Sequence, residues 1–355
     1  MKIKSISSYS ADLSLGRAYE IAFQVNDTAL NVIVEIELEN GIKGLGSAAA
    51  SPHVIGNTVD SVFENLQHEN LQAWIGRNIR EFRVLRRQAA LWYKDDSSAL
   101  TAIDIALHDA FGKHLGIPVY QLYGADVSPR ATSITIGISS VEETLREARE
   151  YAQMGFHVLK IKTGKSLDVD IERCAKVYEE FGADMVVRID GNQGYSAEET
   201  IEFYRRTIDY GIELIEQPMP VGAENELRTL PAEISAKVAC DESLKNARSA
   251  LDLASQPQAC GIYNIKLMKC GGLTGAFEIA TIAKAAQIDL FWGCYDESKI
   301  SISAALHAAM VCPNTKYLDL DGAIFLETDV VSGGYRIEDG IMFPLDQPGF
   351  GCELN

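Results

Sequence analysis

The segment Val158–Gly164, with the sequence VLKIKTG, is the stretch around which the second half of the chain is organised. Side chains alternate between the two faces of a β-strand, so Lys160 and Lys162 share one face while Leu159 and Ile161 share the other. Two lysines in an apolar run are costly to bury unless something uses them, and an edge strand with solvated lysines is the alternative. The residues after Lys162 favour the first interpretation.

From about residue 131 onward, short apolar segments alternate with helical patterns. The expected strands begin near Thr132, Val158, Met185, Glu213, Lys237, Gly261, Asp289 and Tyr317. Strands that alternate with helices imply parallel β/α units, and eight strands with seven intervening helices close most economically into a (β/α)7β barrel of the TIM type. A doubly wound open sheet is the competing α/β fold, but no GxGxxG follows the first strand.

The first 125 residues have a different pattern. Residues 31–38 form a strong strand pattern, the turn Glu39–Gly41 follows, and residues 42–46 run back as a hairpin. Helical patterns come next, at about 58–68, 80–93 and 98–115. We therefore predict an α+β domain over residues 1–125 and the barrel over residues 126–322. Two loops, at about 16–29 and 48–57, are expected to close over a substrate.

Charged residues stand at the ends of five consecutive predicted strands, and they are spaced by 25 to 28 residues, about one β/α unit. They are Lys162, Asp190, Glu216, Asp241 and Lys266. Any one of them alone is compatible with a helix N-cap or a surface charge. Five in phase indicate the C-terminal rim of the barrel, where barrel enzymes carry their chemistry.

Three of these residues, Asp190, Glu216 and Asp241, are carboxylates from adjacent strands. Without a counter-charge they would repel one another, and their pKa values would rise. Oxygen-only ligands favour Mg²⁺ over zinc, so we expect one Mg²⁺ per subunit. Mg²⁺ bound to a substrate carboxylate would stabilise the enolate that forms when the α-proton leaves.

The two lysines, Lys162 and Lys266, are expected to face each other across the pocket. A lysine with an ordinary pKa of about 10.4 is a poor base at neutral pH, but Lys160 and the metal would lower this pKa. Two lysines on opposite sides can remove a proton from one face of a carbon and return one to the other. This arrangement is typical of a racemase or an epimerase.

The eighth predicted strand ends in Asp319 and Asp321, which share a face at the same rim. Neither is needed for the metal, so the pair is predicted to hold a cationic group such as an amine. The alternative is a turn before Gly322.

Composition excludes several functions. The net charge of −18 over 355 residues argues against nucleic-acid binding, and no apolar run is long enough to span a membrane. The seven cysteines are scattered without metal-ligand spacing, as expected for reduced thiols in a cytoplasmic protein. Barrel enzymes often assemble, so a homo-oligomer is possible, but no interface is visible.

The chain resembles the enolase superfamily, in its muconate-lactonizing subgroup, and within it the dipeptide epimerases. The resemblance covers essentially the whole chain. It rests on the motifs Lys160–Lys162 (KIK), Asp190–Asn192 (DGN), Glu216–Pro218 (EQP), Asp241–Ser243 (DES), Asn264–Gly272 (NIKLMKCGG), Gly293–Ser298 (GCYDES) and Asp319–Asp321 (DLD).

The resemblance implies a capping domain followed by the barrel, with the tail of about 323–355 packing back on the cap. It implies a dipeptide substrate whose C-terminal α-carbon is inverted. The implied roles are acid/base for Lys162 and Lys266, carboxylate binding for Lys160, Mg²⁺ binding for Asp190, Glu216 and Asp241, ammonium binding for Asp319 and Asp321, and a further substrate contact for Thr135.

The identity of the accepted side chain is a finer hypothesis. Ala-Glu epimerases use an arginine in the first capping loop, whereas Tyr19–Asp27 contains no arginine or lysine, includes the acidic Glu20 and Asp27, and has only Arg17 at its edge. Asp296, at the end of the seventh predicted strand, could reach the substrate. A cationic or neutral C-terminal side chain is therefore expected, and solvated loop acids are the alternative.

Two other functional classes stay open. A lyase of the same subgroup, making o-succinylbenzoate or a muconolactone, would keep the lysines and the metal but would not need paired aspartates. A non-catalytic binding protein should have lost at least one of the five rim residues, and none is missing. Lys269 is expected to be structural or outward-facing.

Overall fold

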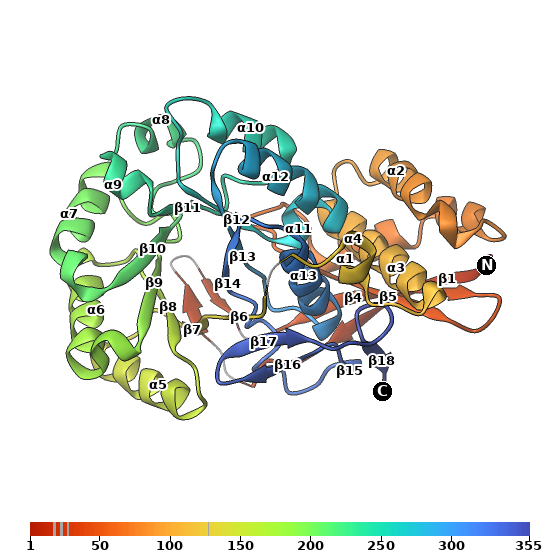
Figure 1. Ribbon diagram of the computed structural model, residues 1–355, viewed down its shortest axis with the longest axis horizontal. Helices are drawn as coiled ribbons and strands as arrows, with labels where there is room; N and C mark the ends of the chain where they lie inside the picture. Colours follow the sequence, from red (N-terminus) through yellow and green to blue (C-terminus); the bar gives the residue numbers. More distant parts are fainter. Residues whose placement is uncertain (17–18, 22–23, 27, 127) are drawn as a thin grey trace.

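The computed structural model describes residues 1–16, 19–21, 24–26, 28–126 and 128–355 (Figure 1). Within these ranges, no helix has the length and apolar character needed to cross a membrane.

The N-terminal region is built on an antiparallel sheet in the order β1 (Ile3–Asp12), β4 (Leu30–Leu38) and β5 (Lys43–Ala49). A short hairpin, β2 (Tyr19–Ile21) with β3 (Gln24–Asn26), stands beside it. Three helices follow and share the apolar core of this sheet: α1 (Val59–Leu66), α2 (Phe82–Trp92) and α3 (Ser97–Leu115). The three predicted helical patterns are thus confirmed, with ends that differ by only a few residues.

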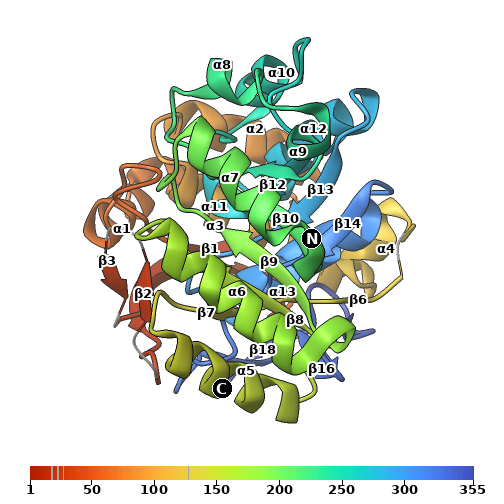
Figure 2. The ribbon, with the colours of Figure 1, turned by 90° about the vertical axis from the view of Figure 1, so that its left-hand side faces the viewer.

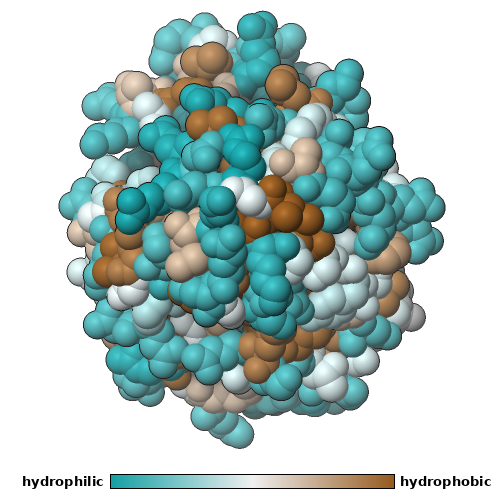
Figure 3. Space-filling model, turned by 90° about the vertical axis from the view of Figure 1, so that its right-hand side faces the viewer, coloured by the Kyte–Doolittle hydropathy of each residue, from teal (hydrophilic) through white to brown (hydrophobic). Residues whose placement is uncertain are grey.

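Glycine allows the sheet to approach α3 closely. A Cβ at Gly46 in β5 would lie 1.9 Å from the carbonyl oxygen of Ala102 in α3, so a larger residue does not fit without movement. The outer face of this half of the molecule is mainly hydrophilic, with separate apolar areas (Figure 3).

The second half is an eight-stranded parallel sheet that curls into a barrel. Its strands are neighbours in chain order: β7 (Ile134–Ile136), β8 (Val158–Lys162), β9 (Val186–Asp190), β10 (Ile212–Glu216), β11 (Val238–Cys240), β12 (Ile262–Ile265), β13 (Asp289–Trp292) and β14 (Thr315–Leu318). A parallel bridge between Thr132 and Leu318 joins the two ends of this sheet. The predicted α/β class and the TIM-type arrangement are therefore confirmed, and each strand begins within two residues of the expected position.

Helices cover the outside of the curled sheet, and Figure 2 shows α5, α6 and α7 side by side in front of β8–β10. Their N-termini carry the expected caps; Ser140 and Ser196, for example, accept hydrogen bonds from the third helical residue. The helices are α5 (Val141–Gln153), α6 (Leu167–Phe181), α7 (Ala197–Thr207), α8 (Glu224–Leu227), α9 (Ala232–Ser235), α10 (Ala247–Ala254), α11 (Leu267–Cys270), α12 (Leu273–Ala285) and α13 (Lys299–Val311).

The C-terminal tail forms two small sheets. One pairs β15 (Val331–Gly333) with β18 (Cys352–Leu354), and the other has the order β16 (Tyr335–Glu338), β17 (Ile341–Pro344) and β6 (Arg130–Ala131). The tail contacts the N-terminal half: Phe350 N donates to Asp109 Oδ1 at 2.8 Å, and Val119 N, in α4 (Val119–Tyr123), donates to Gly349 O at 2.9 Å. The domain boundaries near residues 125 and 322 stay predictions.

Candidate active site

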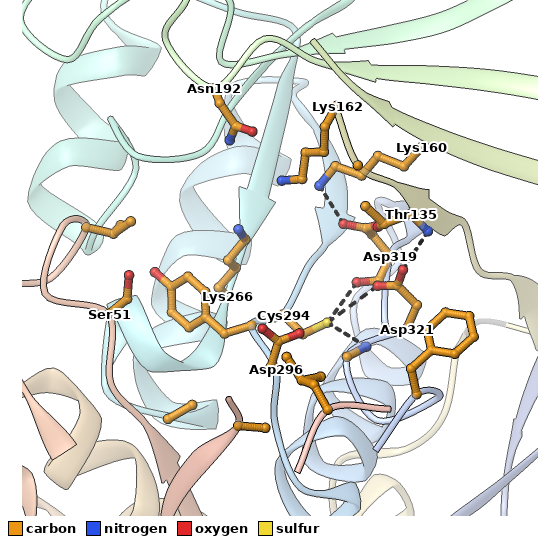
Figure 4. A pocket seen from close by; sticks show the side chains of 18 of the residues that line it. Ser51, Thr135, Lys160, Lys162, Asn192, Lys266, Cys294, Asp296, Asp319 and Asp321 are labelled. Carbon is orange, nitrogen blue, oxygen red and sulfur yellow. Dashed lines mark hydrogen bonds and ion pairs between the residues drawn. The ribbon is translucent and has the colours of Figure 1, made fainter. Parts of the chain in front are cut away.

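A cavity of about 380 Å³ lies at the C-terminal ends of the barrel strands, beside segments of the N-terminal region (Figure 4). The described parts of the two predicted loops contribute Thr28, Ala29 and Ala49–Pro52 to its wall. The rim contributes most of the residues singled out from the sequence: Thr135, Lys160, Lys162, Asp241, Lys266, Asp296, Asp319 and Asp321.

The three carboxylates predicted as metal ligands stand at the ends of three neighbouring strands. Asp190 ends β9, Glu216 ends β10 directly beside it, and Asp241 follows β11; all three are buried. Each forms an ion pair with a lysine: Asp190 Oδ2 with Lys162 Nζ at 2.7 Å, Glu216 Oε2 with Lys160 Nζ at 2.8 Å, and Asp241 Oδ2 with Lys266 Nζ at 2.7 Å. The five in-phase rim residues therefore belong to one cluster.

Lys160 connects this cluster to the far side of the cavity. Its side chain is only 3% exposed, and Nζ lies 2.7 Å from Asp319 Oδ2, 2.8 Å from Glu216 Oε2 and 3.2 Å from Asp190 Oδ2. The edge-strand alternative is wrong, because both Lys160 and Lys162 are buried inside the barrel.

The pKa values of the three carboxylates are shifted in different directions. Burial, followed by repulsion from Asp190, raises the pKa of Glu216 to about 8. Burial also acts to raise the pKa of Asp190, but Lys162 and Lys160 outweigh it and hold this pKa at about 2. Lys266 and Lys269 likewise keep the pKa of Asp241 well below its usual range, against the effect of burial. The cluster therefore stabilises two of its three carboxylates as anions.

The expected lowering of a lysine pKa, which depends on Lys160 and on the metal, stays a prediction. Burial lowers the pKa of Lys266, but nearby acids, Asp241 at 2.7 Å first among them, outweigh burial, and the pKa lies well above the ordinary value. Among the protein's own groups, the Asp241 carboxylate has a larger effect on this pKa than the repulsion from Lys160.

The residues present fit a hard divalent cation in their chemistry. The donor set consists of carboxylate oxygens, which Mg²⁺ prefers, and repulsion from Asp190 adds to burial in raising the pKa of Glu216. Within the described ranges, no three His, Cys, Asp or Glu side chains surround a common point as metal ligands. The lysine ammonium groups instead contact the oxygens that a cation would take.

Asp319 and Asp321 follow β14 and have different surroundings. Asp319 accepts hydrogen bonds on both oxygens, from Ser133 Oγ at 2.6 Å and from Lys160 Nζ at 2.7 Å. Asp321 Oδ2 accepts from the backbone N of Thr135 at 2.8 Å, the carboxylate also has a hydrogen bond from the Thr135 side chain, and the thiol of Cys294 lies 3.9 Å from Oδ1 (Figure 4). Burial, followed by Asp319, raises the pKa of Asp321 to about 6. The negative charge of Asp321 is thus less compensated by neighbouring groups than that of Asp319, which contacts Lys160.

Some residues of the site were missed or misjudged in the sequence. Ser133 had no signal, since nothing in its neighbourhood marks it as a partner of Asp319. Lys269 follows Lys266 by about one helical turn, and of the two roles expected for it, structural or outward-facing, the outward-facing one is wrong. Lys269 is buried, and its Nζ contacts Asp241 Oδ1 and donates to Asp241 O at 2.5 Å.

The residues on which substrate preference was argued are only partly described. Arg17 and Asp27 lie outside the described residues, and so does the side chain of Glu20. Asp296 lines the cavity, and its backbone oxygen accepts from Asn31 Nδ2 of β4 at 3.1 Å, which links this rim loop to the N-terminal sheet.

Comparison with known proteins agrees with this architecture. Residues 10–124 match the family model described as the mandelate racemase/muconate lactonizing enzyme N-terminal domain, and residues 143–355 match the enolase C-terminal domain-like model. An L-Lys-D/L-Arg epimerase from Methylococcus capsulatus is 46% identical over 99% of both chains. An L-Ala-D/L-Glu epimerase from Clostridium acetobutylicum is 31% identical over 99% of both chains.

Solved structures show the same likeness. A crystal structure of the dipeptide epimerase from Methylococcus capsulatus, complexed with Mg and the dipeptide L-Arg-D-Lys, has a TM-score of 0.97 and 45% identity over 99% of both chains. The substrate-liganded L-Ala-D/L-Glu epimerase from Bacillus subtilis has a TM-score of 0.93 and 30% identity over 99% of both chains. The chain belongs to the enolase superfamily, with the N-terminal and C-terminal domains of the mandelate racemase/muconate lactonizing enzymes.

Proposed function

We propose that this chain is a Mg²⁺-dependent dipeptide epimerase that inverts the α-carbon of the C-terminal residue. The observation that carries the proposal is the placement of Lys162 and Lys266. They come from β8 and from the end of β12, which are separated by three strands, and both line one cavity (Figure 4). The names of the relatives, epimerases of dipeptides, support the same reaction.

The chain's own residues account for the proton movements. One lysine takes the α-proton of the C-terminal residue onto Nζ, and the other gives a proton from its Nζ to the opposite face of the same carbon. The product is the epimer, and each lysine ends in the protonation state that the other had. A Mg²⁺ held by Asp190, Glu216 and Asp241 would supply positive charge for the substrate carboxylate and for the negative charge that develops beside it.

The free amino group of the dipeptide is assigned to Asp321, with Asp319 behind it. Asp321 lines the cavity, and the thiol of Cys294 lies 3.9 Å from its Oδ1, so this oxygen can accept a hydrogen bond from an ammonium group. Asp319 contributes negative charge while it stays bound to Lys160 and Ser133. Thr135 fixes Asp321 through hydrogen bonds from its backbone N and from its side chain.

The side chain of the C-terminal residue is proposed to be cationic. Among the described residues, the basic residues of the cavity wall are Lys160, Lys162 and Lys266, and all three are paired with carboxylates. Asp296 adds an acid to this wall. The relative with 46% identity is named for lysine and arginine, which supports a cationic preference.

Proton NMR in D₂O tests the proposal. Each dipeptide, prepared as the L,L and the L,D epimer with lysine, leucine or glutamate at the C-terminus, is incubated with protein and Mg²⁺. Wild type should exchange the C-terminal α-proton of both epimers, fastest with lysine. Lys162→Ala and Lys266→Ala should each lose exchange in one epimer and retain it in the other, because one lysine still serves one face.

The controls separate the parts of the proposal. No exchange with any dipeptide would overturn the epimerase. If either lysine variant changes α-proton exchange equally in both epimers, the two-lysine assignment alone is overturned. A clear preference for C-terminal glutamate would overturn only the cationic side chain.

A further inference from the structure

The three carboxylates of the cluster share one hydrogen-bonding pattern. Each has a rear oxygen held by a fixed donor and a front oxygen that contacts a lysine of the cavity. The rear oxygens are Asp190 Oδ1, Glu216 Oε1 and Asp241 Oδ1. The front oxygens are Asp190 Oδ2, Glu216 Oε2 and Asp241 Oδ2.

Two side chains supply rear donors, and both belong to the segment that carries Lys266. Asn264 Nδ2 donates to Glu216 Oε1 at 2.8 Å, and Lys269 Nζ contacts Asp241 Oδ1. The third donor is the backbone N of Asn192, 3.0 Å from Asp190 Oδ1. Asn264 lies two residues before Lys266, so both point from β12 into the barrel.

Both donors are tightly fixed. Asn264 is fully buried, and the glycine at position 293 leaves room for it: a Cβ there would lie 2.5 Å from Asn264 Oδ1. Lys269 Nζ is also bound by Asp241 O at 2.5 Å and Asn264 O at 3.1 Å, so all three of its protons are used. Neither residue lines the cavity, so their contacts point away from a substrate.

We infer that Asn264 and Lys269 are positioning residues that leave one oxygen each of Glu216 and Asp241 free for the cation. The inference rests on the proposed Mg²⁺ site. A carboxylate held on one oxygen cannot rotate or bind through both, so the front oxygens stay aimed at one region. Partners of this kind typically contribute about 10- to 100-fold to metal affinity.

Titration calorimetry tests the inference without turnover. Protein stripped with EDTA is titrated with MgCl₂ in the absence of dipeptide. Asn264→Ala should raise the Kd for Mg²⁺ by about 10- to 100-fold. The matched control is Asn314→Ala, because Asn314 also donates one hydrogen bond, to Ile288 O at 3.0 Å, and has a buried oxygen without a partner. Asn314 lies before β14, at the opposite end of the barrel, so its variant should bind Mg²⁺ as wild type does.

Lys269→Met gives a second test, because loss of the lysine charge and loss of the hydrogen-bond donor should change the Mg²⁺ affinity in opposite directions. Removing a positive charge beside Asp241 should tighten Mg²⁺ binding if charge alone matters. Loss of the donor that fixes Asp241 should weaken it, and Lys269→Arg should recover part of the affinity. If Asn264→Ala does not fold, as judged by circular dichroism, this pair of variants carries the test.

The outcomes are distinct. Wild type that binds Mg²⁺, with Asn264→Ala binding equally well, overturns the positioning role of Asn264 and leaves the metal site intact. Tighter binding by Lys269→Met overturns the role of Lys269. Wild type that takes up no Mg²⁺ overturns the metal site and the inference together.

Discussion

Glu297 should make the stability of this protein depend on pH. It lies in the rim loop after β13, is 1% exposed, and accepts a hydrogen bond on Oε1 from Tyr295 N at 2.8 Å. Burial raises the pKa of Glu297 to about 7, and the hydrogen bond from Tyr295 only partly opposes this effect. The folded protein therefore holds a proton on Glu297 where an unfolded chain has released it.

The size of the effect follows from the two pKa values. The step from the ordinary value of 4.5 to about 7 corresponds to about 3 kcal/mol, since one pKa unit is worth about 1.36 kcal/mol. Because the folded pKa is the higher one, this contribution is fully present below pH 4.5 and is lost as pH rises through 7.

The assay is urea denaturation of wild type and Glu297→Gln at pH 5 and pH 8. Glutamine keeps an oxygen for Tyr295 N and does not ionise. Between these two pH values, wild type should lose about 2.5 kcal/mol more than the variant. Glu233→Gln, on the exposed surface of α9, is the control and should show no such difference. The reasoning is refuted if wild type and Glu297→Gln differ by the same free energy at both pH values.

Three further predictions concern the site and the fold. Asp321→Asn should raise KM for dipeptides with a free amine by about 10-fold or more, because the asparagine side chain has no negative charge to pair with the ammonium group. KM for N-acetylated dipeptides, which lack the ammonium group, should stay unchanged. In wild type the KM for dipeptides with a free amine should rise as pH falls through about 6, where Asp321 becomes protonated; a flat KM profile would contradict this. Gly46→Ala should destabilise the fold by about 1–3 kcal/mol in urea, since its Cβ would lie 1.9 Å from Ala102 O. EDTA should abolish α-proton exchange while circular dichroism stays unchanged, and loss of structure would contradict a purely catalytic cation.

Much of the fold could be predicted from the sequence because it depends on local periodicity. The strand ends recur once per β/α unit, so the rim that unites Lys162, Asp190, Glu216, Asp241 and Lys266 could be predicted without any contact information. The parallel order of β7–β14 then follows from the chain order alone. Period-two alternation placed the two lysines of β8 on one face, and the charged strand ends that follow Lys162 favoured a buried role for that face.

Hydrogen-bond partners across the barrel were harder to predict from the sequence, because they depend on the twist and spacing of distant strands. Asn264 sits on the same strand face as Lys266, a signal visible in the sequence, but its partner Glu216 is 48 residues away. The effect of Asp241 on the pKa of Lys266 was missed for the same reason, since it depends on a 2.7 Å contact between residues of two strands.

Asp319 and Asp321 show where alternation stops being informative. Alternation places both carboxylates on one face, and so treats them as equivalent. The donors that distinguish them, Ser133 and Thr135, lie 186 residues earlier and reach them only because β7 meets the end of β14. Ser133 and Lys160 use both oxygens of Asp319, whereas Asp321 is held by the neutral donors of Thr135 and by a long thiol contact of 3.9 Å. An incoming ammonium group should therefore pair first with Asp321.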